Sequence, residues 1–222
     1  MTILGIGTVV VDHVVELPAF PAADTKVAVA QDWRQVGGPV PVALSTAAFY
    51  GSGASFLGRW GNDERGTFIT DTLRDRGVDT SECDASDEWS TGFAHVWVDG
   101  VTGSRTIAYS RGQFPLPDSD DVDEKRLTSV RILHLDGWAA GAAIKAAATV
   151  KASGGKVVLD AGSVKPGMGQ LLPLVDVLIA SRLFRRSHFG AEDVDAANML
   201  SLGPAQMILT DGDNGATWLN AD

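Results

Sequence analysis

The segment RILHLDGWAAGAAIKAAATVKASGGKVVLDAG, residues 131–162, decides the fold class of this chain. The run RILHLD predicts a strand, the alanine-rich run AAGAAIKAAATVKAS predicts a helix that ends at Gly154 and Gly155, and KVVLDAG predicts a second strand. This order is a βαβ unit. The alternation continues through MGQLLPLV and AEDVDAANMLSLG as helices and DVLIAS and QMILTDG as strands. We therefore expect an α/β fold with a mostly parallel central sheet and helices on both faces.

The N-terminal half adds one more central strand and interrupts the alternation. The β-branched run from Ile3 to Val11 predicts a buried strand. Residues 14–36 and 91–110 instead alternate apolar and polar side chains around turns, which is typical of hairpins. They predict a small accessory sheet that serves as a lid over a ligand or pairs with another subunit. Between them, residues 36–66 carry glycines at both ends, so the backbone comes close to another element or a ligand there.

Composition excludes several classes of protein. The 222 residues carry a formal charge of −10, and the longest basic run is Arg185 with Arg186, so a nucleic-acid-binding surface is not expected. Cys83 is the only cysteine, which excludes an intrachain disulfide. No apolar stretch reaches membrane-spanning length and no targeting segment is recognisable. We expect a cytoplasmic protein that binds neither nucleic acid nor membranes.

Polar residues end the predicted strands. In an open parallel sheet, ligands bind outside the carboxyl ends of the strands. Each such residue alone is equally typical of a helix N-cap or a turn, but together they indicate a site at one edge of the sheet. The strand-end residues are Asp12, Asp136, Asp160, Ser181, and Thr210 with Asp211.

Two shorter patterns remain open to two interpretations each. In TDGDNGA, Gly212 and Gly215 follow a strand, as in turns whose N–H groups bind phosphate, but a hairpin turn uses the same residues. Arg105 follows the turn of the second predicted hairpin. An arginine on a lid can neutralise a phosphoryl group, whereas one on an edge strand discourages aggregation.

The order of GIGTVVVDH, VGGPVPVA, FLGRWGNDERG, GSRTI, VVLDAG, DVLIAS and ILTDGDNGA resembles the ribokinase/PfkB family of carbohydrate kinases. The pattern is nearest to the ketohexokinase and sulfofructose-kinase branches, and it covers the whole chain, residues 1–222. The resemblance implies a ribokinase-like three-layer fold with a β-sheet lid at about residues 14–36 and 91–110. It also implies transfer of a phosphoryl group from ATP, with Mg²⁺, to a hydroxyl of a small sugar, in a homodimer formed through the lid.

The resemblance assigns four residues to the sugar. It implies that Asp12 hydrogen-bonds sugar hydroxyls and that Gly37 and Gly38 lie against the sugar. Arg105 would contact the sugar or the γ-phosphate of ATP.

A second group of residues is implied for the nucleotide. Ser181 would lie near the triphosphate, while Thr210, Gly212 and Gly215 would line the nucleotide site together with Arg105. No catalytic residue and no metal ligand is assigned.

Three departures from the family pattern limit these expectations. Pro41 or Val42 stands where many members have a sugar-binding Asn. The N-x-x-E element reads SRLF, so Phe184 replaces a carboxylate. The chain ends at Asp222, before the D-T-x-G-A-G-D motif that supplies an anion hole and the catalytic Asp. We therefore expect this chain to be a fragment of a longer protein, or to be completed by another chain, and we expect it to be inactive alone. The alternative is a catalytically silent sugar- or nucleotide-binding module.

Overall fold

A computed structural model describes residues 2–221, and within them the largest element is an eight-stranded sheet. Its strand order is β14-β13-β12-β11-β10-β1-β4-β6. All neighbours pair in parallel except β13 and β14. This confirms the mostly parallel α/β architecture. The strands are β1 Thr2–Ile6, β4 Gly53–Leu57, β6 Val78–Asp79, β10 Ile132–Leu135, β11 Lys156–Ala161, β12 Val177–Ala180, β13 Gln206–Thr210 and β14 Ala216–Asn220.

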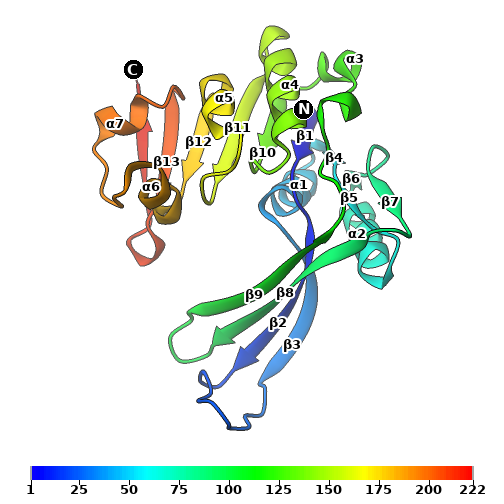
Figure 1. Cartoon of the computed structure of the whole chain (residues 1–222), viewed down its shortest axis with the longest axis vertical. Helices are drawn as coiled ribbons and strands as arrows, with labels where there is room; N and C mark the ends of the chain where they lie inside the picture. Colours follow the sequence, from blue (N-terminus) through cyan, green and yellow to red (C-terminus); the bar gives the residue numbers. More distant parts are fainter. Residues whose placement is uncertain (1, 222) are drawn as a thin grey trace.

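Helices cover this sheet from both sides (Figure 1). On one side α4 (Ala140–Ala152) packs on β10 and β11, with α5 (Met168–Leu171) beside it. On the other side α1 (Pro39–Phe49) packs on β1 and β4, and α2 (Glu64–Asp75) shares its core. Because side chains alternate along a strand, Leu4 of β1 enters the first core and Ile3 enters the second. The result is three layers.

The remaining elements are short and lie around this framework. None of the helices in residues 2–221 has the length and apolar character needed to cross a bilayer. The elements are β5 Arg59–Gly61 paired with β7 Asp84–Ser86, α3 Glu124–Leu127, α6 Arg182–Phe189, α7 Ala196–Leu200, and the 3₁₀ turns η1 Ser119–Asp121, η2 Leu172–Leu174 and η3 Gly212–Asn214.

The second sheet has the strand order β3-β2-β8-β9 and projects away from the main sheet (Figure 1). We call these four strands the lid: β2 Val10–Leu17, β3 Gln31–Gly37, β8 Ser90–Asp99 and β9 Arg105–Gln113. The pairs β2–β3 and β8–β9 are antiparallel hairpins, as expected from the sequence, and β2 pairs with β8 in parallel. The lid therefore joins two hairpins that are distant in the sequence.

The prediction of a single strand from Ile3 to Val11 is wrong in its extent. The segment forms two strands, β1 in the main sheet and β2 in the lid, separated by residues 7–9. A Cβ on Gly7 would lie 2.6 Å from Oδ2 of Asp136, so the backbone here passes against a carboxylate from β10. Consequently Asp12 is not at the end of a main-sheet strand. It lies in the lid strand β2.

The helix expected over residues 191–203 is also shorter than predicted. Only α7 forms, and α6, which follows β12, was not predicted from the sequence. The Oγ of Ser181 accepts a hydrogen bond from the N–H of Phe184 and begins α6 as its N-cap. Phe184 is fully buried in the main core, which explains how this strongly polar helix is held in place.

The motif FLGRWGNDERG joins α2 to the lid. Asp63 is the N-cap of α2, because its Oδ1 accepts from the N–H of Gly66 at 2.8 Å. Its Oδ2 accepts from the N–H of Thr91 in β8 at 2.9 Å. A Cβ on Gly66 would lie 1.9 Å from the carbonyl oxygen of Gly61, so glycine is required for α2 to start against β5.

Replacement of Gly66 by alanine tests this packing. We expect Gly66→Ala to lower the free energy of unfolding by about 3 kcal/mol, because backbone has to move to admit the methyl group. Gly162→Ala is the matched control. No atom lies within 4 Å of the added Cβ there and φ is not positive, so its effect should stay within about 0.5 kcal/mol. Equal midpoints of chemical denaturation for the two variants would contradict the account.

Candidate functional site

A cavity of about 540 Å³ lies between the lid and the carboxyl ends of β1 and β10, and we call it the lid cavity. It brings together all four residues that the sequence predicted for the sugar. The lid strands β2, β3, β8 and β9 supply part of its wall, together with the segments that follow β1 and β10 and the start of α1. The lining residues are Thr8, Val10, Asp12, Gly37, Gly38, Pro39, Val42, Ala94, Arg105, Ile107, Tyr109, Arg111 and Trp138.

The glycine pair allows the chain to pass close to two of these residues. A Cβ on Gly37 would lie 2.4 Å from the carboxylate of Asp12, and one on Gly38 would lie 2.5 Å from the carbonyl oxygen of Thr8. Gly38 also has φ of 104°, a conformation that other residues rarely adopt. The pair is therefore required to fit Asp12 and Thr8 against the start of α1.

Asp12 is the one carboxylate among the residues lining this cavity. Burial raises its pKa, and a hydrogen bond with the side chain of Gln35 partly offsets that shift. A half-buried carboxylate at the cavity wall is well suited to accept hydrogen bonds from hydroxyl groups of a ligand.

The strand β9 contributes a row of side chains that the sequence only partly revealed. Arg105, Ile107, Tyr109 and Arg111 all line the cavity, because alternate residues of a strand share a face. Arg105 was singled out from its place after the hairpin turn, whereas Arg111 was missed. The alternation of side chains along the strand, counted from Arg105, would have predicted Arg111 on the same face.

Trp138 and Thr8 are held in place by Asp136. Its Oδ2 accepts from the N–H and the hydroxyl of Thr8 at 2.8 and 2.9 Å, and its Oδ1 accepts from the N–H of Trp138 at 3.0 Å. Asp136 was expected at a strand end, and Trp138 follows it by two residues. This one carboxylate therefore links the residues that follow β1 to the residues that follow β10.

Two neighbouring carboxyls near the cavity have raised pKa values. Burial raises the pKa of Asp136 despite its three hydrogen bonds. Burial also raises the pKa of Asp160 at the end of β11, and the negative charge of Asp136 adds to that shift. Because both groups bind protons more tightly in the folded protein, their ionisation lowers stability as the pH rises above the ordinary value of 3.8.

Apart from Arg105, the residues predicted for the nucleotide do not line the lid cavity. Ser181 directly follows β12, and Thr210 is the last residue of β13. Because these two strands are parallel neighbours, both residues lie at the same edge of the sheet. Gly212 and Gly215 have positive φ within the turn that joins β13 to the antiparallel β14. Both glycines thus form a hairpin turn, the second of the two interpretations left open by the sequence. Their role toward a nucleotide stays a prediction.

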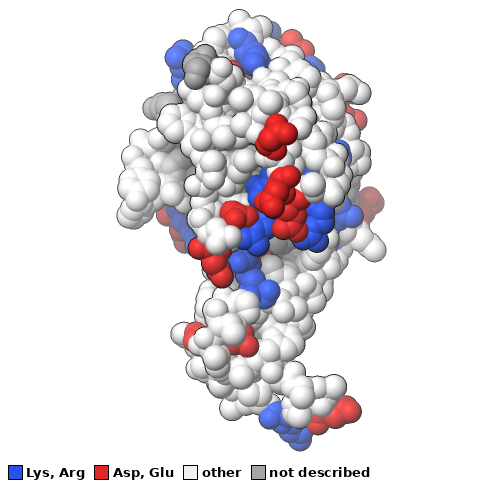
Figure 2. Space-filling view, turned by 90° about the vertical axis from the view of Figure 1, so that its left-hand side faces the viewer, with Lys and Arg blue, Asp and Glu red and all other residues white. Residues whose placement is uncertain are grey.

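Charged side chains fill the region between α6 and this turn. Figure 2, which faces the side of β14 and α7, shows acidic and basic residues gathered across the middle of that surface. Arg182 pairs with Asp211, and the buried Arg185 lies 3.4 Å from the same carboxylate. The hydrogen bond from Arg182 is the main reason that the pKa of Asp211 falls to about 2. Phe184, which replaces the family's carboxylate, lies in the core.

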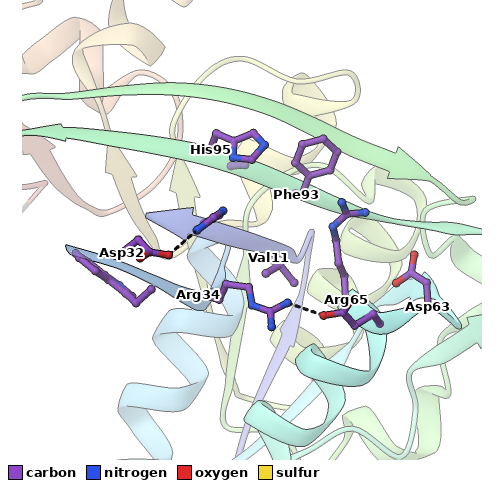
Figure 3. Close-up of a pocket in the computed structure, with 11 residues that line it drawn as sticks. Val11, Asp32, Arg34, Asp63, Arg65, Phe93 and His95 are labelled. Atoms are coloured by element: carbon purple, nitrogen blue, oxygen red, sulfur yellow. Dashed lines mark hydrogen bonds and ion pairs between the residues drawn. The ribbon is translucent and has the colours of Figure 1, made fainter. Parts of the chain in front are cut away.

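A larger cavity, of about 660 Å³, lies on the opposite face of the lid (Figure 3). Its carboxylates already have partners. Asp32 accepts from the ring of His13 at 3.1 Å, Glu64 pairs with Arg34 at 2.7 Å, and Asp63 caps α2. We call it the outer cavity. Because it faces away from Asp12 and from the strand ends, we place the candidate site in the lid cavity.

Residues 2–221 contain no group of three or more His, Cys, Asp or Glu side chains that could hold a metal ion. A magnesium ion that enters with a nucleotide is bound mainly by phosphate oxygens and water. The described residues therefore do not by themselves form a metal site.

The family model described as pfkB family carbohydrate kinase matches residues 2–222. The chain belongs to the PfkB family of carbohydrate kinases. Mouse ketohexokinase is 26% identical over 144 residues, which cover 64% of this chain and 48% of that protein. The 5-dehydro-2-deoxygluconokinase of Clostridium perfringens is 28% identical over 132 residues, 56% of this chain and 39% of that protein. The chain thus matches less than half the length of these curated relatives.

Solved structures show the same ribokinase-like fold. A ribokinase from Arabidopsis thaliana, complexed with ribose and ATP, superposes with a TM-score of 0.78 at 22% identity over 98% of this chain and 74% of that one. A fructokinase from Halothermothrix orenii has a TM-score of 0.79 at 18% identity, covering 99% and 82%. At these identities the likeness establishes the fold alone.

The coupling between the two buried carboxyls gives a measurable consequence. In Asp136→Asn the nearby negative charge is removed, so the pKa of Asp160 should fall toward its ordinary value. Carboxyl-detected NMR titration of Asp160 measures this directly. Asp71→Asn, which removes an exposed carboxylate on α2, is the control and should leave Asp160 unchanged. A titration of Asp160 that is the same in Asp136→Asn and the unsubstituted chain would refute the coupling.

Proposed function

We propose that this chain carries the sugar-binding part of an ATP-dependent sugar kinase, which transfers a phosphoryl group from ATP to a hydroxyl of a small carbohydrate. The observation that carries the proposal is the lid cavity. There Asp12, the glycine pair and Arg105 meet, as the family resemblance implied. Ketohexokinase and 5-dehydro-2-deoxygluconokinase, two relatives, are named for acceptors of this chemical class.

Each side chain has a separate task in this proposal. Asp12 accepts hydrogen bonds from sugar hydroxyls and so orients the acceptor. Val42, which lines the same cavity from α1, offers the sugar an apolar contact, because Pro41 or Val42 stands where many family members have Asn. Arg105 stabilises negative charge on the transferring group, and closure of the lid excludes water from the reaction. ATP is the phosphoryl donor, with Mg²⁺ bound to its phosphates. Ser181, Thr210, Gly212 and Gly215 are proposed for the nucleotide.

A silent binding module is the second candidate function. It is favoured by the region of Ser181, whose hydroxyl donates to the carbonyl of Gly162 while its oxygen caps α6. The one hydrogen of the Ser181 hydroxyl is thus donated within the fold rather than to a phosphate. Phe184, in the place of a carboxylate, is fully buried and offers nothing to a phosphate. Such a module binds sugar without releasing ADP. Because the 222-residue chain is expected to be inactive alone, an assay of sugar-dependent ADP release on a version that includes the C-terminal motif separates the two functions.

Exposed apolar side chains of the lid also support a homodimer, and we propose that the protein is cytoplasmic. Trp33, Ile107 and Tyr109 are 40%, 47% and 67% exposed, and an apolar sheet face of this kind is typical of an interface. We expect light scattering to give the mass of a dimer, and Ile107→Lys to shift it to the monomer because burial of a charge opposes association. A monomeric unsubstituted chain would exclude this interface.

Ligand-induced stabilisation tests the sugar site. A ligand at 100 times its Kd raises the free energy of unfolding by about 2.7 kcal/mol. We expect a sugar from a panel of ketoses and sugar acids to produce such a shift in thermal unfolding. Asp12→Asn should weaken binding by about tenfold or more, because a charged acceptor is lost.

The control for this experiment is Asp32→Asn. Asp32 is on the neighbouring lid strand but faces the outer cavity, so its substitution should leave the sugar-induced shift unchanged. If Asp32→Asn abolishes the shift and Asp12→Asn does not, the sugar binds on the other face of the lid and the proposed site is wrong.

A further inference from the structure

Two positive charges lie against one aromatic ring at the base of the lid cavity. The Cζ of Arg111 is 4.2 Å from the ring centroid of Trp138, and the Nζ of Lys165 is 4.4 Å from it. Arg111 comes from β9 of the lid and Lys165 from the loop after β11. Contacts of a cation with an indole ring are favourable and fix the position of the charge. The ring therefore holds two cations from distant parts of the chain close together.

These cations lack the carboxylate partners that many other cations of the chain have. Arg59 pairs with Asp84 and Asp121, and Arg126 pairs with Asp79 and Glu82. Within residues 2–221, by contrast, no carboxylate oxygen lies within 4.0 Å of a charged nitrogen of the three cations at or beside the lid cavity. These three are Arg105, Arg111 and Lys165.

The acidic residues nearby do not neutralise them. Both oxygens of Asp136 are taken by donors from Thr8 and Trp138. Burial lowers the pKa of Lys165, the charge of Asp136 opposes this shift, and the charge of Arg111 adds to it. Arg111 and Lys165 thus repel each other in the absence of an anion. A ligand anion placed between them would remove this repulsion and form charge-assisted hydrogen bonds.

We propose that the acceptor is an acidic sugar, whose carboxylate binds Arg111 and Lys165 beside Trp138 while Asp12 accepts from its hydroxyls. This inference rests on the proposed sugar-kinase function and narrows its substrate class. The acceptor is favoured over the nucleotide as the source of the anion because Arg111 and Trp138 line the same cavity as Asp12. Ser181 and Thr210 do not line it.

The test uses sugar pairs that differ only in the acid group. In 2-keto-D-gluconate a carboxylate replaces the C1 hydroxymethyl group of D-fructose, and D-gluconate is related to D-glucitol in the same way. Calorimetry on the 222-residue chain gives the Kd of each sugar and of a non-hydrolysable ATP analogue. We expect an acid to bind at least about tenfold more tightly than its neutral partner, with a preference that weakens as salt is added.

Substitutions then locate the acid group. Arg111→Met and Lys165→Met keep an apolar stem on Trp138 and remove the charge, so each should abolish the preference for the acid and leave the neutral sugar little affected. Arg65→Met is the matched control. Arg65 lies 4.5 Å from the ring centroid of Phe93 at the outer cavity, so it resembles Arg111 but faces the other side of the lid. Thermal unfolding verifies that the variants are folded, and the comparison of sugars in the unsubstituted chain needs no variant.

Three results would overturn the proposal, and they differ in what they leave standing. Equal affinity for acid and neutral sugars means a neutral acceptor, and the sugar-kinase function stands. Loss of affinity for the ATP analogue in Arg111→Met, with sugar binding intact, assigns the cations to the nucleotide phosphates. If no sugar and no nucleotide binds, the proposed function itself fails, and this inference fails with it.

Discussion

The carboxylate of Asp136 fixes the point at which the chain leaves the main sheet for the lid. It accepts three hydrogen bonds, two from Thr8 after β1 and one from Trp138 after β10. Gly7 lets the backbone approach this carboxylate, and Gly38 lets the start of α1 approach Thr8. Burial opposes ionisation of Asp136, so these donors are what stabilise its charge. The base of the lid cavity depends on this arrangement.

The lid itself presents two chemically different faces because its side chains alternate. One face carries Asp12, Arg105 and Arg111 beside apolar residues, and it closes over the strand ends. The other carries the ion pair of Arg34 with Glu64 and the hydrogen bond between His13 and Asp32, so these groups already have partners. The outer cavity is the larger of the two, but its charges are largely internally compensated. Uncompensated charge, rather than size, therefore marks the face that suits a polar ligand.

Local patterns predicted most of the fold. The βαβ order and both hairpins were read from periodicity and glycine positions, and the structure has them. The break after Ile6 could not be predicted, because its cause, the contact between Thr8 and Asp136, spans 128 residues. Asp12 was expected at the end of a main-sheet strand, whereas it lies in the lid strand β2 and lines the lid cavity. Arg111 could have been predicted as a cavity residue, because side chains alternate along β9 and it shares a face with Arg105. Lys165 could not have been predicted, because only the folded chain brings it to Trp138.

The central claim is that the lid cavity, and not the outer cavity, receives the acceptor sugar. A crystal structure of the 222-residue chain with 2-keto-D-gluconate tests it most directly. The account predicts density for the sugar between Asp12 and Trp138, with its carboxylate at Arg111. Density for the sugar against His13 and Arg65 in the outer cavity would contradict it.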